Sequence, residues 1–506
     1  MPLVTISATQ PREQHMQIGS IIRRAAIQFG DAPCLTEGER VLSFRDFDAA
    51  TDRLGNALIA KGLKPGDRVG VLLPNSIDCL IAYYAVFKAG LVRVQLNVRE
   101  TLDTHVYKID YVGCRAVIHD SVDGIEAEIP ILFDALLDMI ANGDPTPCTI
   151  DRDLDAPLRL GFTGGTTGKS KAVTLTTRTD LVETAVFLSD LIPELAQGEI
   201  FLHGAPIAHA GGAFFLPSLI RGVHSVVMTK FDTADFLQLA EQTQAAYTFL
   251  VPTMIAMVLD DPAITTARPT FRIISYGASS ISPNLMLRAE ARFGRVFAQC
   301  YGQAESPMAI TYLRPEHHDR IGSCGRPFSV VEVAIFDDDD KALPVGERGE
   351  IVCRGPQTMA YYWDRPEETA KAFRGGWLHT GDIGVMDDEG FFYIVDRKND
   401  MLISGGYNVY PREVEDVLMG YPGVSEVAVV GLPDEKWGDR VIAVVAGQPG
   451  LVVDAIEQFA RENLSGVKRP KEILIWDELP KSGANKILRR TVRDTLMTAR
   501  QTAEAA

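Results

Sequence analysis

The chain has 506 residues, of which 46% are hydrophobic and 23% are charged, and its formal net charge is −17. This length exceeds a single ordinary core, so we expect a globular protein with more than one domain. Because an acidic surface repels phosphate backbones, nucleic acid is excluded as an expected partner.

Cysteine spacing and hydropathy indicate the compartment. The seven cysteines are scattered and never spaced as Cys-x-x-Cys, which argues against a disulfide framework and a thiolate metal site. Polar residues precede any apolar run at the N-terminus, and no apolar run reaches the roughly eighteen residues that a membrane span needs. We expect a cytoplasmic protein with no integral membrane segment. Loose membrane association and a homodimer are both left open.

Residues 69–118 predict alternating strands and helices. An apolar run at 69–73 is followed by Ser76, which can cap a helix that stops at Gly90. The next segments predict a strand at 92–96, a helix near 101–111 and a strand at 116–118. Connections of this length favour parallel pairing with right-handed crossovers. A similar alternation at 201–258 makes the large N-terminal region α/β, with helices covering sheets.

The pattern changes near residue 330 to antiparallel strands, expected at 331–336, 350–353 and 391–395. The acidic run Asp337–Asp340 could suggest a cation site, but adjacent carboxylates are more typical of a solvated hairpin turn. We assign this run no function.

The last hundred residues predict a separate small α+β unit. Strands are expected at 424–430, 441–446 and 473–476, with a helix at 453–464. The charged segment 396–400 separates this unit from the rest of the chain. We therefore predict an N-terminal domain at 1–398 and a C-terminal domain at 399–506.

The stretch from Thr163 to Lys171 has the composition of a phosphate-binding loop. Glycines expose backbone N–H groups, threonines add hydroxyl donors and lysines add charge. The residues assigned to phosphate binding are Thr163, Gly164, Gly165, Thr166, Thr167, Gly168, Lys169 and Lys171. The motif is not a Walker A loop, because Thr163 stands where that loop needs glycine. A Gly- and Thr-rich surface turn is the alternative that this window leaves open.

Further segments make chemical sense if they converge on one nucleotide. In chain order they are Tyr276-Gly277-Ala278-Ser279, Tyr301-Gly302-Gln303-Ala304-Glu305, Trp377-Leu378-His379-Thr380-Gly381-Asp382, Arg397, and Lys486 within Leu479–Ile487. The first can bring backbone close to a flat ring, and the next two end in carboxylates. Each segment alone is a weak signal.

In this order the segments resemble the adenylate-forming superfamily of acyl-CoA synthetases, nonribosomal-peptide adenylation domains and beetle luciferases. The resemblance covers roughly residues 20–495. The turn Ser404-Gly405-Gly406-Tyr407-Asn408 and the Asn485-Lys486 pair look most like the acyl and aryl carboxylate–CoA ligases, including the 4-chlorobenzoate type. The resemblance implies an α/β N-terminal domain of helix-covered sheets with a small distorted barrel, followed by a small mobile α+β lid.

The implied reaction uses ATP, Mg²⁺ and coenzyme A. A small-molecule carboxylic acid first becomes acyl-AMP with release of pyrophosphate, and coenzyme A then takes the acyl group with release of AMP. The resemblance assigns Glu305 to Mg²⁺, Asp382 and Arg397 to the ribose, and Lys486 to catalysis. Hard cations prefer carboxylate oxygen, and a carboxylate can accept hydrogen bonds from both ribose hydroxyls.

The resemblance also implies the walls of the site. His209 matches a gate between the acyl pocket and the thiol channel, with a catalytic role, although a lone His between small residues is often merely packed. The expected acyl pocket takes an aromatic or medium-chain acid and is lined by His209, Ala210, Gly211, Phe249, Tyr276 and Met308. The further cofactor-binding residues are Gly277, Ala278, Ser279, Tyr301, Gly302, Gly405, Gly406, Trp437, Arg469 and Lys471.

The sequence departs from the family pattern at three places. Ala304 replaces the usual Thr before the metal carboxylate, and Asn399 stands where the hinge pivot is Asp or Lys. Gly164 and Ser170 replace the commoner Ser and Pro of the loop. These changes motivate two alternatives to a CoA ligase: a fatty acyl-AMP ligase that loads a carrier protein, and a degenerate homologue that holds nucleotide without turnover. The short path from Glu305 to Gly322, without an insertion, argues against the first.

Overall fold

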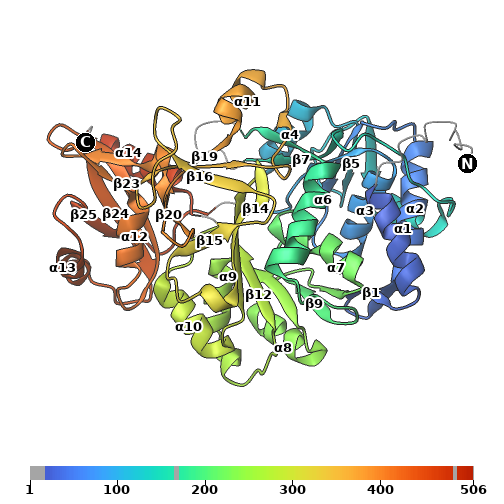
Figure 1. The fold of residues 1–506 in the computed structure, drawn as a ribbon, viewed down its shortest axis with the longest axis horizontal. Coiled ribbons are helices and arrows are strands. Elements are labelled where there is room, and N and C mark those ends of the chain that lie inside the picture. Colours follow the sequence, from blue (N-terminus) through green and yellow to red (C-terminus); the bar gives the residue numbers. More distant parts are fainter. Residues whose placement is uncertain (1–16, 164–169, 482–486, 505–506) are drawn as a thin grey trace, which may run out of the picture.

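The computed structural model describes residues 17–163, 170–481 and 487–504. Two large sheets and their helices account for the chain up to Arg397, and a smaller sheet follows at the C-terminal end (Figure 1). The predicted α/β class with a terminal α+β unit is confirmed.

The first large sheet has the strand order β18-β8-β7-β4-β3-β5-β6. Its strands are β3 (Arg68–Leu72), β4 (Val92–Gln95), β5 (Ala116–His119), β6 (Ile129–Leu132), β7 (Pro157–Phe162), β8 (Ala172–Thr176) and β18 (Tyr361–Tyr362). The predicted parallel pairing of β3 with β4 and β5 is confirmed. Ser76 caps the crossover helix α3 (Ile77–Lys88) by accepting the Cys79 N–H.

The other large sheet has thirteen strands in the order β16-β17-β19-β20-β15-β14-β13-β12-β11-β9-β10-β1-β2. Its parallel part contains β9 (Ile200–His203), β10 (His224–Val227), β11 (Tyr247–Leu250), β12 (Ile273–Gly277) and β13 (Phe297–Gln303), and one edge carries β1 (Pro33–Glu37) and β2 (Arg40–Ser43). Its antiparallel part contains β14 (Ser306–Leu313), β15 (Ser323–Pro327), β16 (Glu332–Phe336), β17 (Gly349–Arg354), β19 (Leu378–Met386) and β20 (Phe392–Arg397). The antiparallel strands, expected in a small barrel, are thus hydrogen-bonded into this sheet.

A layer of helices fills the space between the large sheets. It contains α1 (Ile18–Phe29), α2 (Phe44–Ala60), α3 and α7 (Phe215–Arg221), whose residues share one core. Every residue of α3 is buried, as expected of a helix that is apolar on all sides. The ring of Phe215 contacts Phe47 and Tyr84 with centroid distances of 5.3 and 5.2 Å, which joins α7 to α2 and α3.

The remaining helices of this region lie around the sheets. They are α4 (Leu102–Val112), α5 (Phe133–Asn142), α6 (Thr177–Val186), α8 (Thr233–Thr243), α9 (Pro252–Asp260), α10 (Pro283–Phe293) and α11 (Pro366–Ala372). One apolar run, 249–259, divides between β11 and α9. Pro252 sits at the start of α9, where its missing N–H costs no hydrogen bond.

The C-terminal sheet contains β21 (Leu402–Ser404), β22 (Tyr407–Val409), β23 (Val424–Asp434), β24 (Gly438–Gly447) and β25 (Glu472–Ile475). Helices α12 (Pro411–Leu418) and α13 (Val453–Asn463) cover one face, and α14 (Arg489–Glu504) covers the other. Alternate residues of β23 serve the two faces, because Val427 and Val429 belong to one core while Ala428 and Val430 belong to the other.

Arg489, at the start of α14, ties the C-terminal unit to the joint. Its Nη1 lies 3.2 Å from Asp396 at the end of β20 and 2.8 Å from Asp400, while Nε lies 2.8 Å from Glu415 of α12. One guanidinium therefore bridges the two sides of the predicted boundary. The boundary itself, between residues 398 and 399, stays a prediction.

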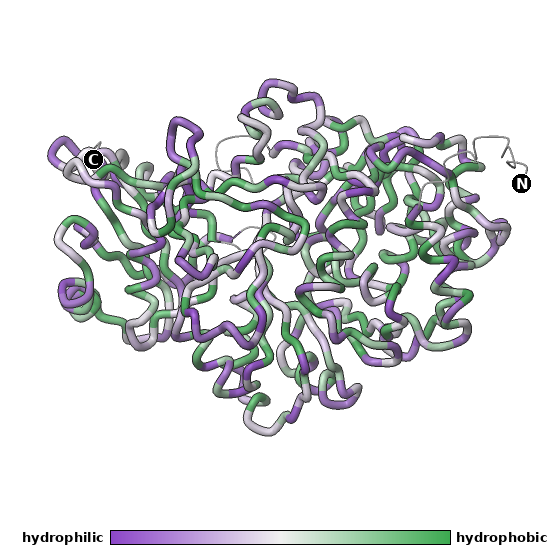
Figure 2. The backbone as a smooth tube through the Cα atoms, in the orientation of Figure 1, coloured by the Kyte–Doolittle hydropathy of each residue, from purple (hydrophilic) through white to green (hydrophobic). Residues whose placement is uncertain are grey.

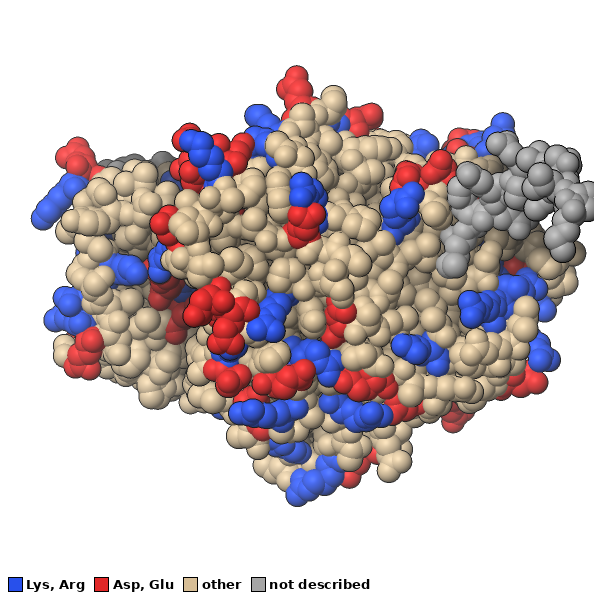
Figure 3. Space-filling view, in the orientation of Figure 1, with Lys and Arg blue, Asp and Glu red and all other residues tan. Residues whose placement is uncertain are grey.

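The surface has the mixed character of a globular protein. Hydrophilic residues gather at the peripheral loops (Figure 2). On the face shown in Figure 3, Lys and Arg are interspersed with Asp and Glu, with no large basic field. The run Asp337–Asp340 forms a turn closed by the Asp337 N–H to the Lys341 carbonyl, as predicted. In the described part of the chain, no helix combines the length and apolar character needed to cross a bilayer.

Candidate active site

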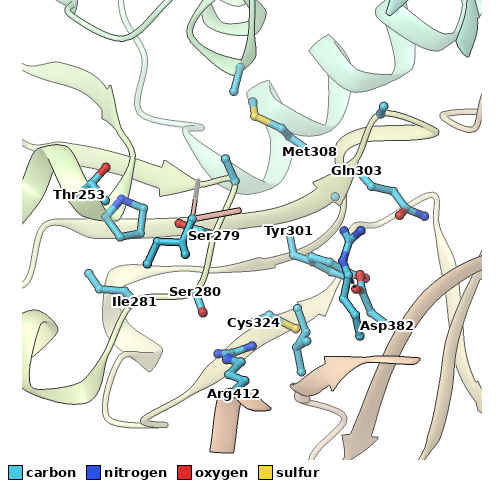
Figure 4. Close-up of a pocket in the computed structure, with 18 of the residues that line it drawn as sticks. Thr253, Ser279, Ser280, Ile281, Tyr301, Gln303, Met308, Cys324, Asp382 and Arg412 are labelled. Atoms are coloured by element: carbon cyan, nitrogen blue, oxygen red, sulfur yellow. Dashed lines mark hydrogen bonds and ion pairs between the residues drawn. The ribbon is translucent and has the colours of Figure 1, made fainter. Parts of the chain in front are cut away.

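A cavity of about 2660 Å³ lies where the large sheets and the C-terminal unit meet. Segments far apart in sequence line it, among them Thr163, Lys171, His209, Ala278, Tyr301, Glu305, Asp382 and Arg397. Figure 4 shows part of this cavity, with Tyr301 beside Asp382 and with Ser279, Ser280 and Ile281 on the opposite wall. The predicted segments therefore converge on one space.

Glu305 and Lys171 meet through Tyr362 of β18. The Tyr362 hydroxyl donates to Glu305 Oε1 at 2.5 Å, and the Lys171 ammonium lies 4.1 Å from the centroid of the same ring. The Glu305 carbonyl accepts the Met359 N–H at 2.7 Å, which fixes its backbone. The carboxylate lines the cavity and is 9% exposed.

A single carboxylate suits one kind of metal. No group of three or more His, Cys, Asp or Glu side chains that could hold an ion exists within residues 17–163, 170–481 and 487–504. Mg²⁺ commonly binds through one or two carboxylates and completes its octahedron with waters and substrate phosphates. Glu305, close to the ends of the phosphate-binding loop, fits that pattern.

The ends of the loop are pinned to each other. Thr163 donates its N–H to the Lys171 carbonyl at 3.1 Å, and its hydroxyl accepts the Lys171 N–H at 3.2 Å. This pairing continues the antiparallel ladder of β7 and β8 to the mouth of the loop. The predicted phosphate-binding residues Gly164, Gly165, Thr166, Thr167, Gly168 and Lys169 lie outside the described residues.

Asp382 lies at the centre of the predicted ribose site. Its Oδ2 accepts the Tyr301 hydroxyl at 2.6 Å, and its Oδ1 lies 3.1 Å from Arg397 Nε. The two oxygens of a carboxylate offer about four lone-pair positions, so both keep acceptor capacity for a ligand. Asp382 and Arg397 are also direct partners in the ladder of β19 and β20.

The predicted nucleotide wall contains tightly packed glycines and unusual backbone. A Cβ on Gly277 would lie 2.4 Å from the Cys300 carbonyl oxygen, and one on Gly302 would lie 2.4 Å from the Met308 nitrogen. The next residue, Ala278, has φ of 68°, and Met308 has φ of 48°. Left-handed backbone at residues other than glycine costs free energy and gathers at functional sites. Ala278, Ser279, Tyr301 and Gly302 line the cavity.

His209 is held between two side-chain amides from the end of β4. Gln95 lies 2.8 Å from Nδ1, and Asn97 lies 2.7 Å from Nε2. The Asn97 oxygen accepts the Arg99 N–H, so its amide nitrogen is the group that donates to Nε2. On the other side of the ring, the Gln95 amide nitrogen is the atom that faces Nδ1. Two side-chain amides therefore orient the ring of the predicted gate residue.

Some of the residues predicted for the acyl pocket lie at the cavity and others do not. His209, Ala210, Tyr276 and Met308 line the cavity. Phe249 is 1% exposed and stacks on Phe214 in the core of the thirteen-stranded sheet, so we assign it to packing.

Packing explains Gly211, and hydrogen bonds explain the position of Tyr276. A Cβ on Gly211 would lie 2.7 Å from the Ala205 carbonyl oxygen, so glycine serves close packing there. The Tyr276 hydroxyl donates to Gln299 at 2.9 Å and lies 3.2 Å from His318 Nε2. Burial lowers the pKa of His318 to about 4, which keeps this ring neutral.

The predicted coenzyme A residues lie together at one end of the C-terminal sheet and are not among the residues that line the cavity. The Lys471 ammonium lies 4.4 Å from the Trp437 ring centroid, and Lys436 lies 5.2 Å from it. Burial and the neighbouring charges of Arg469 and Lys436 lower the pKa of Lys471. Gly405 donates its N–H to the Trp437 carbonyl at 2.7 Å and faces the indole, and Gly406 follows in the same turn.

Three further predicted positions are Lys486, Asn399 and Ala304. Lys486, the predicted catalytic lysine, lies outside the described residues. Asn399 lies in the short helical turn Lys398–Asp400. Ala304 lines the cavity and supplies no hydroxyl beside Glu305.

Tyr362, Gln95 and Asn97 also belong to the site and were not predicted from the sequence. Tyr362 belongs to a two-residue strand that becomes visible only through its pairing with β8. Gln95 and Asn97 had a signal, because polar residues at the carboxyl end of a parallel strand are typical of ligand sites in α/β sheets.

Comparisons with known proteins agree with this geometry. The family described as AMP-binding enzyme matches residues 22–363, and the family described as AMP-binding enzyme C-terminal domain matches residues 413–486. The medium/long-chain-fatty-acid–CoA ligase FadD8 of Mycobacterium tuberculosis is 36% identical, covering 95% of this chain and 89% of that protein. A feruloyl-CoA synthase of an Amycolatopsis species is 35% identical, covering 94% and 98%.

A solved structure shares the whole architecture. The o-succinylbenzoate–CoA synthetase MenE of Bacillus subtilis, in complex with ATP and a magnesium ion, matches with a TM-score of 0.84 and 27% identity. The match covers 93% of this chain and 98% of that one. With this fold, these relatives and these family matches, the chain belongs to the AMP-binding enzyme family, as its motifs predicted.

Proposed function

We propose that this chain joins a small carboxylic acid to coenzyme A in two steps driven by ATP. The reaction class is that of the curated relatives, and the predicted ATP-dependent acid–CoA ligase with Mg²⁺ is confirmed at this level. The observation that carries the assignment is the convergence of Glu305, Asp382 and Arg397 on one cavity, beside the pinned ends of the loop.

The first step forms an acyl-adenylate. A carboxylate oxygen of the acid attacks the α-phosphorus of ATP, and the bond to the leaving pyrophosphate breaks. Both reactants are anionic, so positive groups must offset their repulsion. Lys171 and the loop supply charge near the leaving group, Asp382 with Tyr301 and Arg397 would hold the ribose, and Glu305 would hold Mg²⁺. The ion would neutralise phosphate charge.

The second step transfers the acyl group. The sulfur of coenzyme A attacks the acyl carbon, and AMP leaves. The cluster of Trp437, Lys436, Arg469 and Lys471 offers a ring for stacking and cations for phosphates. Because these four residues do not line the cavity, a role for them in the second step would require the C-terminal domain, 399–506, to change position between the steps. Lys486 would act in the first step.

The acid is an aromatic or medium-chain carboxylic acid in this proposal. Relatives of similar identity are named for medium- and long-chain fatty acids and for ferulic acid, so likeness alone does not separate these classes. His209 and the apolar side chain of Met308 would form the part of the cavity nearest the predicted reacting carbon. The closer likeness to the 4-chlorobenzoate type stays a prediction.

A second candidate is a fatty acyl-AMP ligase that loads a carrier protein, and Ala304 is the observation that favours it. The chain from β14 to β15 argues against it, because the strands are joined by the short segment 314–322, which contains the helical turn Pro315–His317 and no inserted domain. A cytoplasmic location, a homodimer and the lack of a nucleic-acid partner also remain predictions.

The test is a pyrophosphate-release assay with ATP, Mg²⁺ and a panel of aromatic and medium-chain acids, with and without coenzyme A. Thioester formation supports the proposal. Acyl-adenylate that persists in the presence of coenzyme A supports the carrier-protein alternative. No pyrophosphate release across a broad panel would contradict both readings and favour a degenerate nucleotide-binding homologue.

A further inference from the structure

The central strands β4 and β7 present a polar face to the cavity. Arg93 and Arg159 are direct partners in the parallel ladder of these strands, and Gln95 follows on the same side two residues later. All of these side chains line the cavity, as does Gly161 of β7. Here we call Arg93, Gln95, Arg159, Asp180 and Glu183 the polar lobe.

The opposite face of the same strands is apolar. Val92, Val94 and Leu160 are at most 1% exposed and belong to a core with α4. Parallel strands covered on both sides are usually apolar on both sides, because no water reaches either face. The polar residues at 93, 95 and 159 therefore depart from what the fold alone requires.

The charges of the polar lobe are not fully paired. Arg159 Nε lies 2.8 Å from Asp180, and its Nη2 lies 3.3 Å from Glu183, both from helix α6. Arg93 takes part in no ion pair with any residue that the structure describes; it lies over the Tyr83 ring, 4.1 Å from the centroid. Within the same residues, the buried atoms Arg93 Nε and Glu183 Oε1 have no hydrogen-bond partner.

Burial leaves the polar lobe with an excess of positive charge. It raises the pKa of Glu183 to about 8, so this carboxyl is mostly protonated at neutral pH. It also lowers the pKa of Arg93, whose charge lacks a carboxylate partner. Two guanidinium groups then face one carboxylate, that of Asp180. An unpaired buried charge is costly unless a ligand or solvent compensates it.

The polar lobe adjoins the expected reacting centre. Gln95 contacts the ring of His209, the gate residue, at 2.8 Å. Gly161 has no side chain next to Gln95, and a Cβ there would lie 3.3 Å from the Gln95 amide oxygen. Tyr84 and Thr184 line the same part of the cavity. An acid whose carboxylate reacts beside His209 can therefore extend its far end along β4 toward Arg93.

We infer that the polar lobe binds a second carboxylate at the far end of the substrate, with Arg93 as the specificity-determining residue. This inference rests on the proposed acid–CoA ligase function and narrows its substrate class to dicarboxylic acids. A guanidinium with free N–H groups matches a carboxylate in geometry and charge, and the resulting charge-assisted hydrogen bonds are strong. Plain alkyl or aryl ends would leave Arg93 buried without a partner.

The test compares matched acids on the full-length enzyme. Heptanedioic and heptanoic acid, and terephthalic and 4-methylbenzoic acid, are assayed for pyrophosphate release with wild type, Arg93→Met and Arg93→Lys. Wild type should favour the dicarboxylic member of at least one pair in kcat/KM. Arg93→Met should reduce that preference on the order of ten-fold, chiefly through KM, whereas Arg93→Lys should restore part of it. Arg178→Met, an exposed change on the same helix as Glu183, serves as the control.

Direct binding separates this inference from the proposed function. Isothermal titration of the dicarboxylic acids into wild type and Arg93→Met reports on the polar lobe without turnover, and circular dichroism checks that the variant folds. Tighter binding to wild type than to the variant supports the inference even if no acid is activated. A wild-type preference for the methyl-ended acids, or equal binding by wild type and variant, would overturn the inference. The polar lobe would then be a solvated internal charge cluster without a ligand.

Discussion

At the residue scale, Tyr362 links the metal carboxylate to the phosphate-binding loop. Its hydroxyl donates to Glu305 while its ring contacts Lys171. Tyr362→Phe keeps the ring and removes the donor, so the carboxylate loses its orientation. Since partners that orient a metal ligand typically contribute 10- to 100-fold, we expect pyrophosphate release to fall by about ten-fold.

The Mg²⁺ dependence of the rate is the measurement for Tyr362→Phe. The half-saturating Mg²⁺ concentration should rise in the variant. Tyr361→Phe, at the exposed neighbouring position, should behave as wild type. An unchanged Mg²⁺ dependence in Tyr362→Phe would contradict the assignment of Glu305.

Asp382 gives a prediction about AMP binding. Asp382→Asn keeps the shape of the side chain but replaces one acceptor oxygen by an NH2 donor and removes the negative charge, so either the Tyr301 hydroxyl or the Arg397 guanidinium loses its acceptor. We expect AMP affinity, measured by isothermal titration, to fall by at least about ten-fold, equivalent to roughly 1.4 kcal/mol. Asp388→Asn, at an exposed turn, is the matched control. Equal affinities in the two variants would remove Asp382 from the nucleotide site.

Glu183 gives a prediction about pH. Burial raises the pKa of its carboxyl from 4.5 to about 8, so the folded state holds the proton more tightly than the unfolded state. Its contribution to the free energy of unfolding is complete below pH ~4.5 and is lost as the pH rises to ~8. Glu183→Gln does not titrate, so its melting temperature should depend less on pH across this window. The exposed change Glu435→Gln should leave the wild-type slope, and an identical slope in Glu183→Gln would refute the shift.

The residues of the site differ in how far the sequence could reveal them. Glu305 and Asp382 were predicted because each ends a recognisable motif, and Arg397 was predicted from its place after them in the family's order of segments. Tyr362 could not be predicted, because its partner Glu305 comes from another sheet and no local pattern joins them. Arg93 could not be predicted either. A single Arg among valines is typical of a solvent-facing strand position, and only the strand order shows that β4 is central in its sheet.

At the scale of elements, Arg489 fixes the start of α14 against the joint. Arg489→Met would leave Asp396, which is 2% exposed, and Glu415 without their shared cation. Losing one partner of a buried ion pair costs several kcal/mol, and the partly exposed guanidinium reduces this to about 2 kcal/mol. We expect a lower melting temperature and faster proteolysis near residues 398–400.

The control for Arg489→Met is Arg490→Met, a substitution at the exposed neighbouring position. The Arg490 side chain is 59% exposed and forms a helical pair with Asp494, 3.7 Å away, and such exposed pairs contribute little, so this change should be nearly neutral. If both variants were equally stable and equally resistant to protease, the bridge at the joint would not hold the two units.

Elements with strong local signals were predicted within one or two residues. The expected strands at 69–73 and 116–118 are β3 and β5, and Ser76 caps α3 as predicted. Strand ends that depend on tertiary pairing were predicted less well. The strand β23 extends to Asp434, four residues beyond the expected end, because its pairing with β24 continues past the apolar run. The continuity of the thirteen-stranded sheet likewise depends on pairings that no local pattern encodes.

At the scale of the whole molecule, the two chemical steps should respond to different parts of the chain. Trp437 lies in the turn between β23 and β24, near Lys436 and Lys471, and does not line the cavity that would hold ATP. Trp437→Ala should raise the KM for coenzyme A about ten-fold through lost stacking, while acid-dependent pyrophosphate–ATP exchange stays within about two-fold of wild type. An equal loss of activity in both steps would show that Trp437 contributes to overall stability and not to coenzyme A binding.

The central claim is that the acid attacks the α-phosphorus of ATP. An acid found to turn over is labelled with oxygen-18 in its carboxylate, and the AMP released on thioester formation is examined by mass spectrometry. One carboxylate oxygen stays on phosphorus when coenzyme A takes the acyl carbon, so AMP should carry a single oxygen-18 atom. Unlabelled AMP, or label in ADP or inorganic phosphate, would contradict the adenylate route.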